Sequence, residues 1–407
     1  MRVAVIGGGP AGMMAAYEAA RVHEVHLFDG NEKMGKKLYL TGKGRCNVTN
    51  AAPIEDFFDA IIRNREFLYS SLYSFSNRDL MDWFEENVPL KVERGGRVFP
   101  KSDKSSDILQ ALERKLKDQG VRIHLYEHVT SLSQDGDGFI VETGKRRESF
   151  DAVVVATGGL SYPSTGSTGK GYEFAKKFGH HIVQPVPALT GFRTERDVSP
   201  LSGLSLRNVS LKAKCLGKKA YEEQGEALFT HRGISGPIAL RLSSLVNREK
   251  EFSLFLDLKP ALTGDELHRS LQKNFDDEPK KSLSSILRLR LPRALVPYIL
   301  EEAKLLENRP VHSVTKKERE RLVLAMKNFP LGGASLEPIG GAIVTSGGVE
   351  VSEIDPSRMQ SRRVKGLYFC GEILDVDAWT GGYNLQIAFS TGFLAGKSLC
   401  EDTEKED

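Results

Sequence analysis

The sequence predicts an α/β protein whose first domain is discontinuous, with parts near both ends of the chain. Three observations carry this prediction. A short apolar strand at 2–6 runs into a glycine-rich turn and an alanine-rich helix, as at the start of a parallel sheet. A second buried strand, 151–159, ends in small residues. A third strand, 366–372, ends in glycine and an acid, and a helix over 386–398 follows it.

The first turn carries the pattern G-x-G-x-x-G at Gly7, Gly9 and Gly12. In a Rossmann-like unit these glycines allow a tight turn, a close backbone approach to a diphosphate, and close packing of helix on strand. The next strand, 24–29, ends at Asp29, which can accept hydrogen bonds from ribose hydroxyls. The context predicts a dinucleotide on the N–H groups of the helix start. A glycine-rich turn of another α/β protein is the alternative.

Two further segments favour FAD over a nicotinamide dinucleotide. Residues 36–50 form a loop dense in glycine and in hydrogen-bond donors, which an extended FAD needs and a short nicotinamide site does not. Residues 381–384 open the C-terminal helix, whose first N–H groups can stabilise a reduced flavin ring. Because no second G-x-G-x-x-G occurs, a separate NAD(P)H domain of the same type is not evident.

Composition excludes several classes of protein. The 407 residues suit two or three domains, and 57 basic against 54 acidic side chains indicate no particular partner. The four cysteines form no CxxC pair, which argues against a metal site and fits the reducing cytoplasm. Residues 1–20 contain a triple glycine and a proline, and 378–396 contain several polar residues, so neither predicts a membrane segment. No pattern indicates an oligomeric state.

The middle of the chain divides into two patterns. Short apolar or alternating stretches up to residue 258 predict β strands, whereas residues 263–328 have the period of helices. The last of these helices opens with Thr315 and Glu318, a capping box. Its basic residues are interpreted as solvated surface, with phosphate tracking as the alternative: Lys316, Lys317, Arg319 and Arg321.

Seven motifs, in order along nearly the whole chain, resemble those of the bacterial HI0933-like flavoproteins. This family is also called the aminoacetone oxidase-like or BaiN/RdsA-type NAD(P)/FAD-dependent oxidoreductases. The motifs are GGGPAGMMAA (7–16), GKGRCNVTN (42–50), GGRVFP (95–100), ATGGLSYPSTGSTGKGY (156–172), FTHRGISGP (229–237), TSGGVEVSEI (345–354) and GEILDVDAWTGGYNLQIAFSTGFLAG (371–396). A more distant resemblance to the fumarate reductase flavoproteins is carried by ATGG, the TG-x-G turn and the terminal GE.

The resemblance implies three domains: a Rossmann-like FAD-binding domain (1–188 and 346–407), a β-barrel-like domain (189–258 and 329–345), and a helical insertion (259–328). This chain departs from the family pattern at four positions. Asp29 replaces the usual Glu, Lys170 stands where Asp is common, Ala378 where Gly is common, and Arg232 where the family has an apolar or aromatic residue.

The predicted FAD contacts come from the segments above and from the resemblance: Gly7, Gly9, Pro10, Ala11, Gly12, Asp29, Gly42, Gly44, Arg45, Cys46, Asn47, Val129, Ala156, Thr157, Gly158, Gly371, Glu372, Asp377, Gly382, Asn384 and Leu385. His231 is a candidate proton donor because histidine titrates near neutrality, with a structural role as the alternative. Tyr162 is a second candidate, or a wall of the pocket. Further pocket candidates are Arg232, Ser235, Trp379 and Tyr383. Cys46 is interpreted as a small residue packed on the cofactor, with a redox thiol as the alternative.

Three functions remain open. The first is an FAD-dependent reductase that passes hydride from NAD(P)H to a polarised double bond, in a small metabolite or in a uridine of ribosomal RNA. The second is a flavin oxidase of a small amine such as aminoacetone. The third is a non-enzymatic FAD protein whose partner is RNA or another protein. Hydrolysis is not supported, because no Ser-His-Asp set and no HExxH occur.

Overall fold

The computed structural model describes residues 1–216 and 219–404. The chain forms two compact units, one from Met1–Pro187 with Ile339–Asp407 and the other from Ala188–Pro338. The first unit is therefore discontinuous. The chain returns to it at Ile339, earlier than the residue 346 expected from the sequence. The reason is that β18 (Val344–Val349) is buried throughout and joins β11 (Ile182–Ala188) in a two-stranded sheet.

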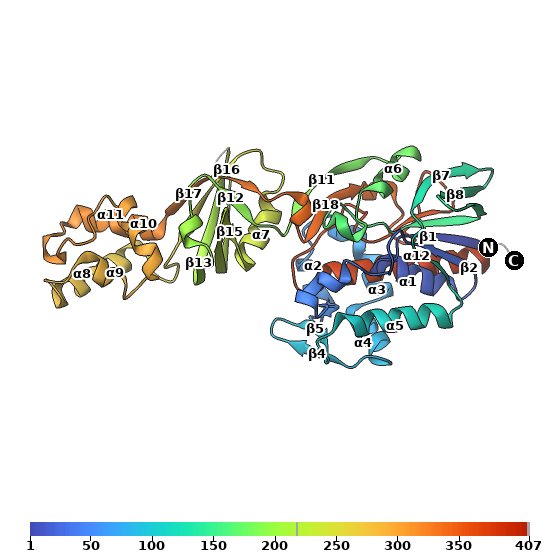
Figure 1. Ribbon diagram of the computed structural model, residues 1–407, viewed down its shortest axis with the longest axis horizontal. Helices are drawn as coiled ribbons and strands as arrows, with labels where there is room; N and C mark the ends of the chain where they lie inside the picture. The colour runs from blue at the N-terminus through green and yellow to red at the C-terminus, as the bar shows by residue number, and fades with distance from the viewer. Residues whose placement is uncertain (217–218, 405–407) are drawn as a thin grey trace. The chain divides into compact units, whose positions relative to one another are not determined.

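A parallel five-stranded sheet lies in the first unit, in the order β19-β10-β1-β2-β6. Figure 1 labels two of its strands, β1 and β2. Its strands are β1 (Arg2–Ile6), β2 (Glu24–Phe28), β6 (Arg122–His124), β10 (Ala152–Val155) and β19 (Leu367–Phe369). The apolar strands β1, β10 and β19 are buried almost throughout, as expected where helices cover a parallel sheet.

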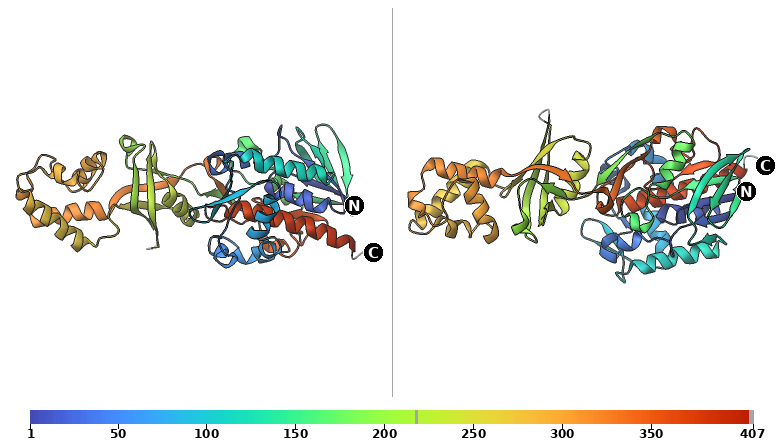
Figure 2. Two further views of the ribbon diagram at one scale, coloured as in Figure 1. Left: turned by 90° about the horizontal axis from the view of Figure 1, so that it is seen from below. Right: turned by 45° about the horizontal axis from the view of Figure 1, so that its top comes forward.

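Two helices from opposite ends of the chain pack side by side in this unit (Figure 2). They are α1 (Pro10–Ala19) and α12 (Tyr383–Glu404). A Cβ atom on Gly392 would lie 2.2 Å from the carbonyl oxygen of Ala11, and one on Gly396 would lie 2.6 Å from that of Ala15. This backbone contact helps to explain why residues 386–396 lack charge: that part of α12 is mostly buried, with Gly392 and Gly396 against α1. No helix in the described part of the chain has the length and apolar character needed to cross a membrane.

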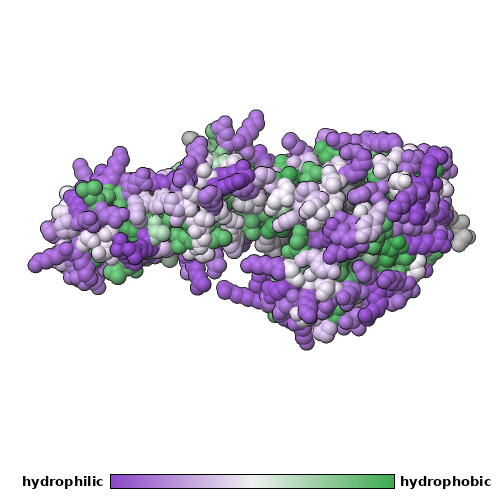
Figure 3. Space-filling model, viewed as in Figure 1, coloured by the Kyte–Doolittle hydropathy of each residue, from purple (hydrophilic) through white to green (hydrophobic). Residues whose placement is uncertain are grey.

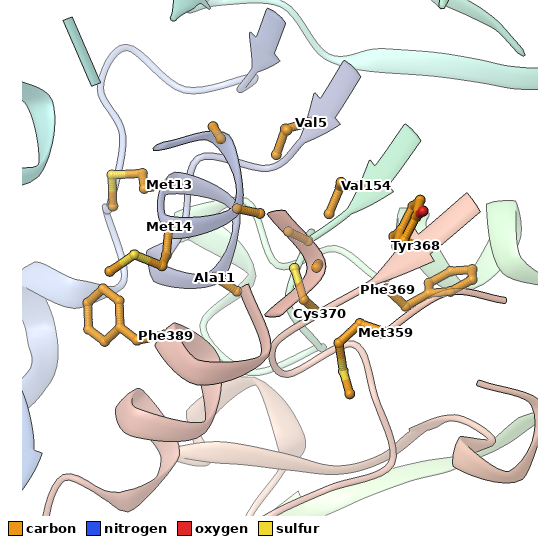
Figure 4. Close-up of a cluster of buried hydrophobic side chains, with 14 of the residues drawn as sticks. Val5, Ala11, Met13, Met14, Val154, Met359, Tyr368, Phe369, Cys370 and Phe389 are labelled. Atoms are coloured by element: carbon orange, nitrogen blue, oxygen red, sulfur yellow. The ribbon is translucent and has the colours of Figure 1, made fainter. Parts of the chain in front are cut away.

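Side chains from β1, β10, β19 and both helices meet in one hydrophobic core (Figure 4). The cluster includes Val5, Val154, Tyr368, Met14 and Phe389, each no more than 1% exposed. At about 25 cal/mol for each square ångström of apolar surface removed from water, such burial is the main stabilising term. The core therefore fixes the carboxyl ends of β1, β10 and β19, where the candidate site lies.

Smaller elements surround this core. Two three-stranded antiparallel sheets have the orders β3-β5-β4 and β7-β8-β9. The elements are β3 (Thr49–Asn50), β4 (Leu90–Glu93), β5 (Arg97–Pro100), β7 (Val129–Asp135), β8 (Gly138–Thr143), β9 (Arg147–Phe150), α2 (Ile54–Asp59), α3 (Tyr69–Ser74), α4 (Asn77–Glu85), α5 (Ser105–Asp118) and α6 (Lys170–Lys177).

The second unit contains a closed antiparallel barrel, with the strand order β12-β15-β14-β13-β16-β17. The elements are β12 (Phe192–Thr194), β13 (Ser205–Cys215), β14 (Ala220–Thr230), β15 (Gly233–Ser235), α7 (Pro237–Val246), β16 (Phe252–Asp257) and β17 (Phe329–Leu336). Between β16 and β17 the chain forms α8 (Gly264–Asp277), α9 (Leu283–Leu287), α10 (Val296–Glu302) and α11 (Lys316–Lys327). This confirms the predicted fold class, a Rossmann-like domain with a barrel that itself carries a helical insertion.

The helix α11 begins as predicted but buries one of its cations. Thr315 and Glu318 form a full capping box, with each side chain bonded to the backbone N–H of the other. The face of the insertion seen in Figure 3 is mostly hydrophilic. Lys316 and Lys317 are exposed, as expected. Arg319 is only 8% exposed, and its Nε lies 3.1 Å from Nε2 of His268. The interpretation of Arg319 as solvated surface was therefore wrong, because α11 turns that position toward α8.

Candidate FAD-binding site

In the glycine-rich turn after β1, close contacts with the backbone require two of the glycines, whereas a third glycine faces open space. Gly7 has φ +108°, and a Cβ there would lie 2.5 Å from the carbonyl oxygen of Ala156. A Cβ on Gly12 would lie 1.9 Å from the carbonyl oxygen of Gly7. Gly9, at the N-cap of α1, has no atom within 4 Å of its Cβ position. The space at Gly9, beside the first N–H groups of the helix, fits a diphosphate.

Asp29 connects the end of β2 to this turn. Its Oδ2 accepts a hydrogen bond of 2.8 Å from the N–H of Gly8, and its Oδ1 accepts two of 2.8 Å from Asn31. A carboxylate offers about four lone-pair sites, so acceptor capacity remains for a ribose hydroxyl. Asp29 thus has a structural role in addition to the predicted one. The shorter side chain still reaches the turn.

Several buried polar atoms in this unit have no hydrogen-bond partner among the described residues. They include Oδ1 of Asn47, Oγ1 of Thr157 and the hydroxyl of Tyr172. Such atoms are rare in folded proteins because each one costs about 1–3 kcal/mol. Asn47 and Thr157 belong to the predicted FAD contacts, so their free acceptors fit a polar cofactor. Burial, and then the charges of Glu372 and Asp375, raise the pKa of Tyr172 above its ordinary value. The sequence reasoning missed this tyrosine.

Glu372 lies at the centre of a polar network that joins four segments. Its carboxylate is bonded by Nζ of Lys37, by Oγ of Ser161 and by the backbone N–H of Thr345, at 2.6–3.0 Å. Oγ1 of Thr345 in turn accepts hydrogen bonds from the N–H groups of Leu160 and Ser161. The sequence prediction included Glu372 but not Lys37, Ser161 or Thr345. Their contacts with Glu372 could not be predicted from any local pattern, since the four residues lie far apart along the chain.

The turn before α12 is held in place by its own side chains. Gly382 has φ +101°, and a Cβ there would lie 2.2 Å from the carbonyl oxygen of Thr49, so no larger residue fits. Asn384 bonds the backbone N–H and the carbonyl oxygen of Ala378 at 3.0 and 2.8 Å. Its amide therefore shapes the loop. Oδ1 of Asp377 accepts a hydrogen bond of 2.9 Å from Oγ of Ser346.

In the loop after β2, the Arg45 guanidinium pairs with acidic side chains of the protein and the Cys46 thiol is buried. The guanidinium of Arg45 pairs with Glu93 at 2.8 Å and Asp103 at 3.3 Å, and lies 4.1 Å from the ring centroid of Phe99. Cys46 is fully buried, and burial raises the pKa of its thiol to about 12. A thiolate is the reactive form of cysteine, so this environment disfavours a redox role. Gly42 and Gly44 both have positive φ, which bends the loop.

The remaining predicted contacts belong to several different elements, and their contact with the cofactor stays a prediction. Gly371 has φ +80°, and its Cβ position lies 2.7 Å from the Cβ of Ala11, the residue after Pro10. Val129 begins β7 and is 7% exposed, and Leu385 lies in the first turn of α12. Lys170, at the start of α6, pairs with Glu173 at 2.6 Å.

The pocket candidates divide between the two units. Tyr162, Trp379 and Tyr383 belong to the first unit, and the ring of Tyr383 lies 4.6 Å from that of Phe57. His231 and Arg232 are exposed on the turn between β14 and β15, in the second unit, and Ser235 ends β15. Among the described residues no group of three or more His, Cys, Asp or Glu side chains is placed to hold a metal ion.

Comparison with known proteins identifies the family. The HI0933-like protein Rossmann domain family matches residues 1–398. A 3-dehydro-bile acid delta(4,6)-reductase of Clostridium scindens is 31% identical over 98% of this chain and 99% of its own length. A ribosomal RNA dihydrouridine synthase of Haemophilus influenzae is 30% identical over 97% of both chains.

Among solved structures, a 3-ketosteroid delta1-dehydrogenase from Sterolibacterium denitrificans has a similar fold, with a TM-score of 0.52. It is 15% identical, over 98% of this chain and 99% of that one. The fold, the open space at Gly9 and the unpartnered acceptors at Asn47 and Thr157 agree with the family assignment. The chain belongs to the HI0933-like family of Rossmann-type flavoproteins and is an FAD-dependent oxidoreductase.

Proposed function

We propose that the protein adds hydrogen to a polarised carbon–carbon double bond, with hydride passed from NAD(P)H through FAD. The observation that carries the proposal is the similarity, over nearly the whole chain, to two relatives that differ in substrate. One is named a reductase of a bile acid and the other a synthase of dihydrouridine in ribosomal RNA. Both names describe hydrogen addition to a double bond. The substrate of this chain is then a conjugated small molecule or an RNA uridine.

The bound FAD would supply the hydride transfer, and the residues of this chain bind, orient and balance charge. The turn at Gly9 and the start of α1 would hold the diphosphate. Asp29, Asn47, Thr157 and Glu372 would accept or orient hydroxyl and amide groups along the cofactor. The first N–H groups of α12 have no partner within the helix, and the helix dipole there stabilises nearby negative charge.

A proton must accompany hydride when a double bond is saturated. We assign this role to His231 as the first candidate and to Tyr162 as the second. His231 is exposed, and an N–H group of its imidazole ring is of the type that can donate a proton to a substrate atom. Arg232 and Ser235, beside it on the same turn and strand, would orient a polar substrate group. Trp379 and Tyr383 would provide apolar and aromatic walls.

The cellular setting is also a proposal. None of the four cysteines, all of which lie in the described part of the chain, forms a disulfide, and Cys46, Cys215 and Cys370 are buried. Free buried thiols are typical of a reducing compartment, so we place the protein in the cytoplasm.

Anaerobic stopped-flow spectroscopy of the FAD-loaded protein tests the electron donor. NADPH or NADH should bleach the flavin absorbance within seconds, whereas aminoacetone should not. Reoxidation of the reduced protein by a conjugated enone, or by a uridine-containing ribosomal RNA fragment, then identifies the acceptor. Bleaching by the amine but not by either nucleotide would overturn the proposal in favour of an oxidase. If neither donor reduces the flavin, a non-enzymatic role becomes the better account.

The proton donor is tested on the same apparatus. His231→Gln should leave flavin reduction by the nucleotide unchanged and slow reoxidation by the acceptor about a hundredfold, the usual lower range for a lost general acid. Tyr162→Phe provides the comparison. If the histidine variant reoxidises at the wild-type rate and the tyrosine variant does not, the assignment moves to Tyr162.

A further inference from the structure

The ammonium group of Lys37 has all its donors occupied by the protein. Nζ lies 2.5 Å from Oγ of Ser161, 2.9 Å from Oε1 of Glu372 and 2.6 Å from Oε2 of the same carboxylate. A protonated lysine has three N–H donors, so three acceptors saturate it. In this arrangement Lys37 has no N–H left for a phosphate, although the loop that carries it was expected to donate along the cofactor.

The two oxygens of Glu372 are used unequally. Oε1 accepts from Lys37, from Ser161 at 3.0 Å and from the N–H of Thr345 at 2.8 Å. Among the described residues, Oε2 accepts only from Lys37. Oε2 also lies 4.0 Å from the Cβ position of Gly158, a predicted FAD contact with φ +70°. The free acceptor capacity of this carboxylate is therefore on Oε2, near Gly158, whose Cβ position is bounded by Oγ of Ser167 at 3.1 Å.

The network depends on four segments that are distant in sequence. Lys37 follows β2, Ser161 follows β10, Thr345 lies in β18 and Glu372 follows β19. The Lys37 and Glu372 side chains are 22% and 21% exposed, so solvent screens their pairing only partly. A carboxylate held by three groups keeps one orientation, which lowers the ordering cost of binding a ligand.

We propose that Lys37 is a positioning residue for FAD: it orients Glu372 so that Oε2 accepts a hydrogen bond from a hydroxyl group of the cofactor. Lys37 acts through the carboxylate and does not contact the cofactor with its own ammonium group. The proposal concerns cofactor binding and does not depend on which substrate the enzyme reduces.

The neighbouring lysine provides a matched control. Nζ of Lys36 pairs with Glu32, four residues earlier in the same loop, at 3.0 Å, and the side chain of that partner is 44% exposed. Nζ of Lys36 also donates to Oδ1 of Asn31 at 3.3 Å. The two lysines share the same loop, charge and side-chain length, but only Lys37 reaches Glu372. A general loss of positive charge near the cofactor would affect both variants alike, whereas loss of positioning affects one.

The test measures FAD affinity of the apoprotein by flavin fluorescence, with thermal unfolding of each apoprotein recorded in parallel. Lys37→Met should weaken FAD binding at least about tenfold, which corresponds to about 1.4 kcal/mol. Lys36→Met should stay within about twofold of wild type. Lys37→Arg, whose planar fork can engage both carboxylate oxygens, should recover most of the affinity.

A double-mutant cycle separates positioning from direct contact. If Lys37 acts through Glu372, then Lys37→Met combined with Glu372→Gln should bind FAD no more weakly than Glu372→Gln alone. The double variant replaces both charges with neutral groups, so it leaves no unpaired buried charge and should unfold close to the wild-type temperature. Additive losses in the cycle would overturn the proposal, as would wild-type FAD affinity in Lys37→Met. Equal losses in the Lys36 and Lys37 variants would overturn it as well.

Discussion

A Cβ atom on Gly12 would stand 1.9 Å from the carbonyl oxygen of Gly7, so the first turn of α1 lies directly against the end of β1. The opposing atom belongs to the backbone and cannot rotate away. Gly9 lies between these two glycines in sequence, has an ordinary φ of −81° and meets nothing within 4 Å. Packing within the protein therefore requires glycine at positions 7 and 12 but not at position 9, where we propose that the cofactor is the constraint.

Substitutions in this motif should separate stability from cofactor binding. Gly12→Ala should lower the free energy of unfolding of the apoprotein by about 1–3 kcal/mol or more, because the added methyl overpacks a backbone contact. Gly9→Asp should leave the apoprotein stable and abolish FAD retention, since its carboxylate repels a diphosphate. Urea unfolding and the flavin spectrum measure the two effects. Undiminished FAD in Gly9→Asp would show that the motif does not hold the cofactor.

Thr157→Val should act only on the cofactor-bound state. Its Oγ1 has no partner among the described residues, so an isosteric methyl removes no hydrogen bond from the apoprotein. We expect unchanged or slightly higher apoprotein stability and about tenfold weaker FAD binding. Thr391→Val is the control, because the Thr391 hydroxyl accepts from the N–H of Gly371 and donates to the carbonyl of Ile387. It should lose about 1–3 kcal/mol of stability. Similar stability losses in both variants would contradict this difference.

Cys46 should resist alkylation in the folded protein. The side chain is fully buried, and its thiol has a pKa of about 12, so almost no thiolate is present at pH 8. Cys400 is partly exposed and serves as the internal comparison. Iodoacetamide followed by mass spectrometry should label Cys400 first and Cys46 only after denaturation. Equal labelling in the native protein would restore the redox-thiol hypothesis.

Stability should fall in two steps as the pH decreases, because of a buried histidine and its partner. Nδ1 of His180 lies 3.0 Å from Glu353, and Nε2 lies 2.8 Å from the hydroxyl of Ser361. That hydroxyl accepts from the N–H groups of Arg363 and Val364, so it donates to a neutral imidazole. Burial lowers the pKa of His180 below its ordinary value of 6.5. Below about pH 6.5 this histidine is protonated in the unfolded chain but stays neutral in the folded protein. The free energy of unfolding therefore decreases as the pH falls.

Glu353 accounts for the second step. Its hydrogen bond to Arg363 is the main cause that holds its pKa at about 2, against 4.5 for the free side chain. The contribution of Glu353 to the free energy of unfolding is complete above about pH 4.5 and is lost as the pH falls toward 2. Urea unfolding from pH 5 to 8 checks the first step: His180→Gln should reduce the slope of stability against pH. The variant should keep some of the slope, because burial also lowers the pKa values of His23 and His124. An unchanged slope would rule out His180 as its source.

Local patterns predicted much of the fold. The strand at 2–6 and the capping box at Thr315 and Glu318 occur as expected, because each depends on residues close together in sequence. The return to the first unit at Ile339 was expected later. Strand β18 contains Thr345, Ser346 and two glycines, so its sequence lacks the alternation of apolar and polar residues that predicts a strand. Its glycines, Gly347 and Gly348, allow the strand to approach other backbone closely. Only tertiary neighbours make that segment a strand.

In the candidate site too, some features follow from local sequence and others only from tertiary contacts. The sequence by itself determined the family, through seven motifs in order along the chain, and the FAD class of cofactor, through residues 36–50 and 381–384. It also predicted the turn that would receive the diphosphate, because G-x-G-x-x-G, the following helix and Asp29 are one contiguous unit. The tertiary structure alone decided that the charges of Arg45 and Lys37 are used within the protein, and that Ser161 and Thr345 hold Glu372. A side chain's partners depend on which distant strand ends meet at one edge of the sheet. The hydrophobic core that packs β1, β10, β18 and β19 together determines which strand ends become neighbours. No short stretch of sequence contains that information.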